Sequence, residues 1–151
     1  MPARGLDAIE AQLSTLDEPG LDDLRARLCI GLHWNVEVTD EPEQAGQIVS
    51  QALCSALPVA YTGLARQRWS RFAPLVLEAT YEATLLAGLL NARRGGSNIV
   101  LLTHLGGGAF GNDPKWIDAA MRRALALLRG QDLQVRIVSY GAPAPLGPFS
   151  S

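Results

Sequence analysis

The chain has 151 residues, of which 48% are hydrophobic and 19% are charged, which is enough for one domain with a hydrophobic core. The formal net charge of −2 argues against an extended surface for nucleic acid or for an anionic membrane. The sequence has no apolar run of the roughly 18 residues that a membrane span needs, and its first residues lack the apolar core of a signal peptide. We therefore expect a cytoplasmic protein without nucleic-acid or membrane partners.

The first half of the chain alternates between helical and extended patterns. Residues 6–28 carry an apolar stripe at helical spacing, which a Pro-Gly pair interrupts. Residues 29–38 alternate between apolar and polar side chains and predict a strand, and residues 47–54 predict a second one. Residues 71–92 predict the longest helix. Apolar residues cover most of its surface, so we expect it to be largely buried.

The second half predicts a strand, a loop, a helix and a strand. Residues 98–103 are a continuous apolar run, typical of a central parallel strand, and residues 114–129 and 133–140 predict a helix and a final strand. Such a unit joins parallel strands through a right-handed crossover, which indicates an α/β fold. We expect one domain over residues 1–140 and a flexible tail, rich in proline and glycine, over residues 141–151.

The glycine-rich loop after the strand at residues 98–103 has the clearest chemical meaning. Three consecutive glycines followed by Gly111 are more than a tight turn requires, although a turn alone is the simpler interpretation. Without side chains, the backbone allows a ligand to approach its amide groups. Asp113 is suited to cap the next helix and Pro114 to begin it. The N-terminus of a helix at the end of a strand favours an anion such as phosphate.

The candidate ligand-binding residues therefore follow one another along this loop: Gly106, Gly107, Gly108, Ala109, Phe110, Gly111 and Asn112. Phe110 either stacks on a sugar or base or packs back on the sheet. Asn112 either donates to a ribose hydroxyl or caps the helix. The loop lacks the βαβ continuation of a dinucleotide-binding fingerprint, and no Lys-Ser or Lys-Thr follows its glycines as in a P-loop.

Few groups outside the loop offer chemistry. His104 precedes the glycines at a strand end and is a further candidate for substrate contact. Glu78 and Glu82 lie four residues apart on the long helix, either as an acid–base pair or as a solvent-exposed stripe. Cys29 and Cys54 are expected to be buried free thiols. No spacing of ligating residues predicts a metal site, and we expect no cofactor.

The second half of the chain resembles the C-terminal half of macro domains, closest to the poly(ADP-ribose) glycohydrolase-like branch. The resemblance rests on the apolar strand, on Gly-Gly-Gly-Ala-Phe-Gly-Asn-Asp-Pro at residues 106–114, on the helix after it and on Val-Arg-Ile-Val-Ser-Tyr at residues 135–140. The long helix, with Tyr-Glu-Ala-Thr-Leu-Leu at residues 81–86, has a counterpart in the family as well. About residues 45–140 are covered.

The resemblance implies a three-layer fold with a mixed, largely parallel sheet between helices. It also implies a loop that wraps the diphosphate and distal ribose of ADP-ribose, with backbone contacts from Gly107, Gly108, Ala109 and Gly111 and with Phe110 against the ribose. The first half of the chain departs from the family. Residues 1–46 match neither its first ligand loop nor the paired glutamates of its glycohydrolases, and no acidic residue corresponds to the one that binds adenine.

Three functions are compatible with these features. The first is binding of ADP-ribose or a related nucleotide diphosphate by the glycine-rich loop. The second is an ADP-ribosyl hydrolase completed by His104, Glu78 or Glu82, or by a partner chain that supplies the first ligand loop. The third is a non-catalytic protein that self-assembles, because an incomplete sheet leaves open edges that pair with another copy.

Overall fold

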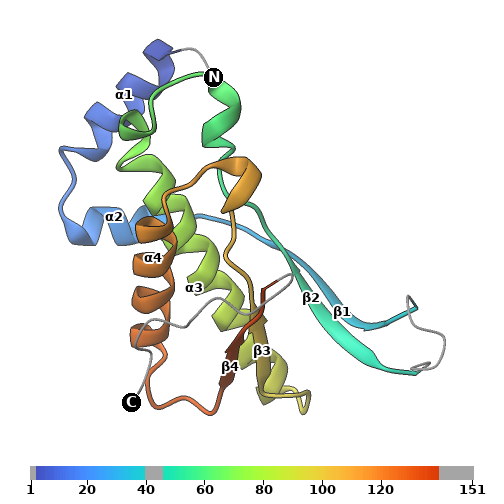
Figure 1. The fold of residues 1–151 in the computed structure, drawn as a ribbon. Helices are drawn as coiled ribbons and strands as arrows, with labels where there is room; N and C mark the ends of the chain where they lie inside the picture. The colour runs from blue at the N-terminus through green and yellow to red at the C-terminus, as the bar shows by residue number, and fades with distance from the viewer. Residues whose placement is uncertain (1–2, 40–45, 140–151) are drawn as a thin grey trace.

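The computed structural model describes residues 3–39 and 46–139, and these form a mixed α/β fold (Figure 1). The predicted tail at residues 141–151 lies outside the described residues. The elements, in chain order, are α1 (Ala3–Leu13), α2 (Glu18–Arg25), β1 (Gly31–Glu37), β2 (Ile48–Leu53), the 3-10 turns η2 (Val59–Thr62) and η3 (Arg66–Trp69), α3 (Phe72–Arg93), β3 (Ile99–Leu102), the 3-10 turn η4 (Gly108–Phe110), α4 (Pro114–Leu127) and β4 (Gln134–Ile137).

The described strands form two separate pairs. β1 and β2 are antiparallel, with a register shift between His33 and Val36, and β3 and β4 are parallel. The β3–α4–β4 unit therefore confirms the predicted crossover between parallel strands. The single mixed sheet that we expected is not formed by the described residues, because no pairing joins β2 to β3. In Figure 1 the β1–β2 hairpin diverges from the β3–β4 pair.

The main hydrophobic core lies between α3, α4 and β3. Leu77, Tyr81 and Leu85 follow one another at four-residue spacing along α3 and are almost completely buried. They pack with Val100 and Leu102 of β3 and with the inner face of α4, which consists of Ile117, Ala120, Met121 and Ala124. The alternating burial of β3 places its other side chains on the opposite face, where they are exposed.

A smaller core joins α1 to the beginning of α3. Leu6, Val59, Trp69 and Ala73 are buried together there. Glu10 of α1 accepts hydrogen bonds from the backbone N–H groups of Arg71 and Phe72, at 2.8–3.2 Å. A side chain 61 or 62 residues away in the sequence thus caps α3, in place of a local capping residue.

Among the described helices, α3 alone is long and apolar enough to cross a membrane. One such helix is weak evidence for a membrane span. α3 contacts α1, α2, α4, β2 and β3, but only 33% of its 18-residue apolar window is buried. The expectation of a largely buried helix is therefore wrong, because the buried residues lie between Ala73 and Leu85 and the end of the helix is more exposed.

The packing of α3 predicts different costs for two adjacent leucines. The side chain of Leu85 is fully buried, whereas Leu86 is 47% exposed. Leu85→Ala removes buried methyl groups and leaves a cavity, so we expect it to lower the free energy of unfolding by about 3 kcal/mol. Leu86→Ala, as a matched control in the same helix turn, should cost less than about 1 kcal/mol. Urea denaturation measures both, and equal losses would contradict this packing.

Candidate functional site

The glycine-rich loop is fastened to α3 at the point where β3 ends. The hydroxyl of Tyr81 donates to the carbonyl of Thr103 at 2.7 Å and accepts from the N–H of Leu105 at 2.8 Å. Tyr81 is 2% exposed, and burial raises the pKa of its hydroxyl to about 12, so it remains a donor at neutral pH. One side chain thereby binds two residues that follow β3 at the start of the loop.

Asn112 closes the loop from its other end. Its backbone N–H donates to the carbonyl of Gly106 at 3.1 Å, and its side-chain amide donates to the carbonyls of Gly106 and Leu57 at 3.0 and 2.8 Å. The residue is only 3% exposed. Asn112 does not cap α4, because Asp113 is the N-cap. The side-chain amide is used to hold the loop together, and contact with a ligand stays a prediction for this residue.

The glycines of the loop serve different purposes. Gly106 and Gly111 have φ angles of +75° and +71°, and a Cβ atom would lie 2.4 Å from Ala56 in the first case and 2.7 Å from Ala60 in the second. Close packing against the preceding segment thus requires glycine at both positions. Gly108 also has a positive φ, of +59°, but its added Cβ would meet no atom within 4 Å. Gly108 faces open space.

The accessible amide groups belong to η4 rather than to α4. Gly108 and Ala109 are exposed, and their N–H groups precede the first hydrogen bond of this 3-10 turn, from Gly111 N–H to the carbonyl of Gly108. The carboxylate of Asp113 accepts from the N–H of Lys115 at 2.9 Å. Asp113 thus caps α4 as expected, and its carboxylate already accepts from one N–H group at that end. Anion binding at the N-terminus of α4 stays a prediction.

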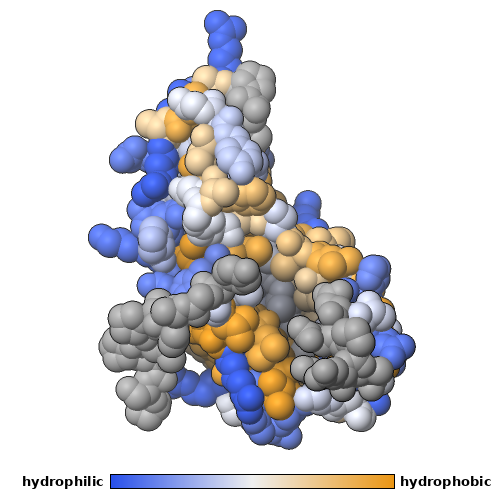
Figure 2. Space-filling model, turned by 45° about the vertical axis from the view of Figure 1, so that its right-hand side comes forward, coloured by the Kyte–Doolittle hydropathy of each residue, from blue (hydrophilic) through white to orange (hydrophobic). Residues whose placement is uncertain are grey.

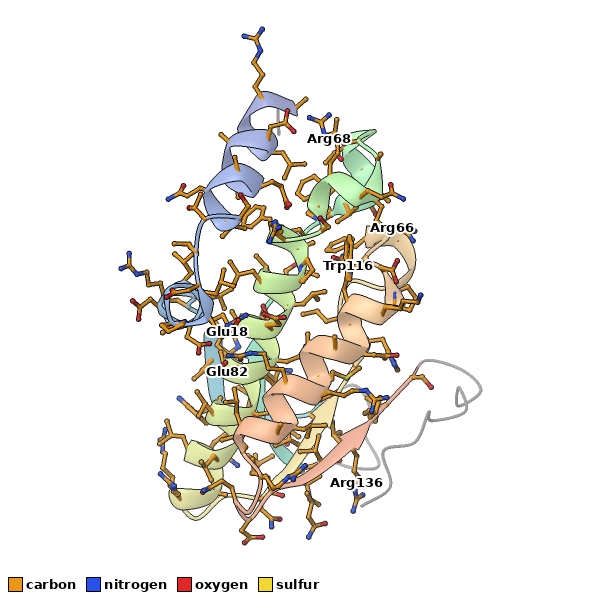
Figure 3. The ribbon with its side chains drawn as sticks, turned by 90° about the vertical axis from the view of Figure 1, so that its left-hand side faces the viewer. Glu18, Arg66, Arg68, Glu82, Trp116 and Arg136 are labelled. Atoms are coloured by element: carbon orange, nitrogen blue, oxygen red, sulfur yellow. The ribbon has the colours of Figure 1, made fainter. Side chains whose placement is uncertain are left out.

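Two aromatic rings and one arginine border the loop. Phe110 is half-buried against the main core and contacts Tyr61 edge-to-face, with 5.7 Å between the ring centroids. The ring of Phe110 thus packs on the protein and also meets Tyr61, which is 68% exposed. Arg66 lies 3.6 Å from Asp113 and is half exposed. Figure 3 shows Arg66 and Trp116 at this end of α4. No sequence pattern places Tyr61 or Arg66 at the loop, because both lie about 40 residues before the glycines in the chain.

His104 lies at the edge of the loop and has an acidic neighbour. Its Nε2 atom is 4.0 Å from the Oδ1 atom of Asp118 in α4, and both side chains are partly exposed. The sequence offered no acidic partner for this histidine, since Asp118 is 14 residues further along the chain. The distance is that of a charge contact when His104 is protonated, and it is too long for a hydrogen bond.

Glu78 and Glu82 belong to an ion-pair network between α2, α3 and α4. Arg25 contacts Glu78 through Nε and Nη2, at 2.8 and 2.7 Å, and Arg123 contacts Glu82 at 2.7 Å. Asp22 bridges both arginines, and Glu18 contacts Arg25 as well. In Figure 3, Glu18 and Glu82 lie together, well away from Trp116 and Arg66 at the loop end of α4. The interpretation as a free solvent-exposed stripe is therefore wrong, whereas the acid–base role of this glutamate pair stays a prediction.

The two cysteines and the possible metal ligands lie outside the loop. Cys29 is exposed, contrary to the expectation, and Cys54 is half-buried with its Sγ atom 3.8 Å from the hydroxyl of Thr84. Within the described residues, no group of three or more His, Cys, Asp or Glu side chains is placed to hold a metal ion.

Comparisons with protein-family models, with curated proteins and with solved structures find no match to this chain.

The ion-pair network predicts a strong effect of one arginine on stability. Burial by itself lowers the pKa of Arg25, but hydrogen bonds and charge interactions with its carboxylates outweigh burial and raise it, so the side chain is charged. Arg25→Met keeps most of the apolar stem but leaves Glu78, whose side chain is 19% exposed, without its partner. We expect a loss of about 3 kcal/mol in the free energy of unfolding.

The matched control for this variant is Arg27→Met. Arg27 is exposed just beyond α2, and its loss should change stability by less than about 0.5 kcal/mol. Thermal or urea denaturation measures both variants. An Arg25→Met protein as stable as the control would show that the network contributes nothing.

Proposed function

We propose that the loop at residues 104–112 binds the diphosphate of ADP-ribose or of a related nucleotide diphosphate. The observation that carries the proposal is the exposed η4 turn. Its Gly108 and Ala109 N–H groups have no partner within the turn, and Gly108 faces open space at the end of a parallel strand. Backbone donors in such a turn suit the oxygens of a phosphate.

The neighbours of η4 fit the other parts of such a ligand. Arg66 supplies a half-exposed positive charge, and arginine binds phosphate through two parallel hydrogen bonds. Phe110 and the exposed Tyr61 present aromatic surface to a sugar. ADP-ribose is the preferred ligand because the order of residues in the loop is similar to that of macro domains.

The proposal includes the fold. The β3–α4–β4 unit with α3 packed against it supports this part of the proposal. In the described residues, α3 and α4 pack on one face of β3 and its other face is exposed, so the third layer rests on the resemblance alone. The first ligand loop of that family has no counterpart in residues 1–46 of the sequence. We therefore propose binding rather than hydrolysis, since Glu78 and Glu82 are held by arginines and His104 is the remaining candidate beside the loop.

Titration with ADP-ribose tests this function. Calorimetry should show saturable binding, and at ten times the dissociation constant the ligand should stabilise the fold by about 1.4 kcal/mol. Ala109→Glu places a carboxylate at the exposed turn and should weaken binding at least tenfold, because it repels the diphosphate. Ala119→Glu adds the same charge at an exposed site of α4 and serves as the control.

Two outcomes would contradict the proposal. The first is the absence of both heat and thermal stabilisation at millimolar ADP-ribose. The second is equal loss of binding in Ala109→Glu and Ala119→Glu, which would show a general charge effect instead of a site at η4.

A further inference from the structure

A large groove separates the two pairs of strands. It has a volume of about 880 Å³, β2 and β3 form its walls, and α3 forms its floor with Thr80, Thr84, Ala87 and Gly88. Figure 2 shows this side of the molecule, where hydrophobic residues gather at either side of a hollow. Consecutive residues of both strands line the groove, namely residues 47–54 and 99–103. Successive side chains of a strand point to opposite faces of a sheet, so a groove lined by consecutive residues is bordered by the edge of the strand and not by one of its faces.

The edge of β3 that faces the groove has unpaired backbone groups. The N–H groups of Gln134 in β4 and of Val138 just after it donate to the carbonyls of Asn98, just before β3, and of Leu102. The backbone groups of even-numbered residues along β3 therefore point toward β4. The backbone groups of Leu101 and the carbonyl of Ile99 therefore point away from β4. In the described part of the chain, no backbone hydrogen bond joins these groups to another strand.

Contacts to α3 hold the two strands in the same direction. The Ser50 hydroxyl contacts Asn91, which donates to the carbonyl of Ser97, and these links join the beginnings of β2 and β3. At the other end of the groove, Cys54 contacts Thr84 and Thr103 accepts from Tyr81. β2 and β3 are thus parallel to each other, and both run opposite to the direction of α3. They are placed like two strands of a sheet from which the strand between them is missing.

The lining of the groove restricts what can occupy it. None of its residues is charged, and four of the large hydrophobic side chains that are exposed on the described surface belong to it: Ile48, Leu53, Ile99 and Leu101. A charged segment would lose its hydration there without gaining a partner. The floor of small residues leaves room for a backbone to approach α3.

We infer that this groove binds an extended, uncharged polypeptide segment of a partner protein, which pairs as a strand with β2 on one side and with β3 on the other. Such strand addition supplies main-chain hydrogen bonds along both edges and places alternate side chains on the floor. The groove reaches Thr103 and Leu105, so one end of the bound segment lies beside the glycine-rich loop. The inference does not depend on nucleotide binding.

Other occupants fit less well. An edge strand of a second copy already has a neighbour on one side, so it cannot enter between two edges. The sequence at residues 140–151 contains Pro143, Pro145 and Pro148, and a strand paired on both sides does not accommodate prolines that lack the N–H group.

Two synthetic peptides test the inference in the full chain. The first is the uncharged peptide acetyl-Ser-Thr-Val-Thr-Val-Thr-Val-Ser-amide. The second has the same sequence with the three valines N-methylated, which keeps the side chains but removes one row of donors. Amide hydrogen exchange followed by NMR should show at least tenfold slowing at Leu101 with the first peptide. The N-methylated peptide should bind at least tenfold more weakly.

Two variants locate the binding. Ala87→Phe fills the floor of the groove and should weaken binding of the first peptide at least tenfold, whereas Leu86→Phe, at the next residue and outside the lining, should not. The exchange rates of buried amides in α3 report in the same experiment that each variant is folded.

Three results would overturn the inference. One is equal binding of the two peptides, which indicates adsorption to a hydrophobic surface without strand pairing. The second is no change at Leu101 with millimolar peptide. The third is a slowly exchanging Leu101 amide in the protein alone together with a dimer mass by light scattering, which would make a second copy the occupant.

Discussion

The arrangement of this protein depends on α3, because no pairing within the described residues joins the two pairs of strands to each other. Its buried face packs with α4 and β3, and polar groups along the helix contact both β2 and the segment around β3. The Tyr81 hydroxyl is the most consequential of these groups, since it binds the carbonyl of Thr103 and the N–H of Leu105 at once. Packing along one helix thus determines where the glycine-rich loop begins and how far apart β2 and β3 lie.

This constraint separates the structural from the functional part of the loop. Gly106, Gly111 and Asn112 bring the two ends of the loop together and press it against the segment at residues 56–60. Only η4 then extends toward solvent, with Gly108 and Ala109 at its start. Such packing holds the backbone N–H groups of the turn in a fixed orientation. Binding of an anion then does not carry the entropic cost of ordering these donors. The ion pairs of Glu78 and Glu82 with Arg25 and Arg123 join α2, α3 and α4.

The sequence predicted the features that depend on neighbouring residues. The helices α3 and α4, the parallel β3–β4 pair and the Asp113 cap follow from apolar spacing and from local capping chemistry. The features it missed join residues far apart in the chain, such as Arg25 to Glu78, Tyr81 to Thr103 and Asn112 to Leu57. The excess of glycines predicts a ligand-facing loop, with a tight turn as the alternative. Gly106 and Gly111 instead have close contacts with Ala56 and Ala60, which no local pattern reveals. The turn η3 and the Glu10 cap of α3 were missed for the same reason.

The central claim is that α3 positions η4 so that the amides of Gly108 and Ala109 bind the diphosphate of the ligand. Mapping of backbone amide chemical shifts during titration with ADP-ribose tests this claim most directly, because it reports on each N–H group separately. The account predicts that the largest saturable shifts occur at Gly108 and Ala109, with smaller shifts at Leu105, and that these shifts are absent with ribose alone. Shifts centred on the ion-pair network around Glu78 and Glu82, with Gly108 and Ala109 unchanged, would contradict it.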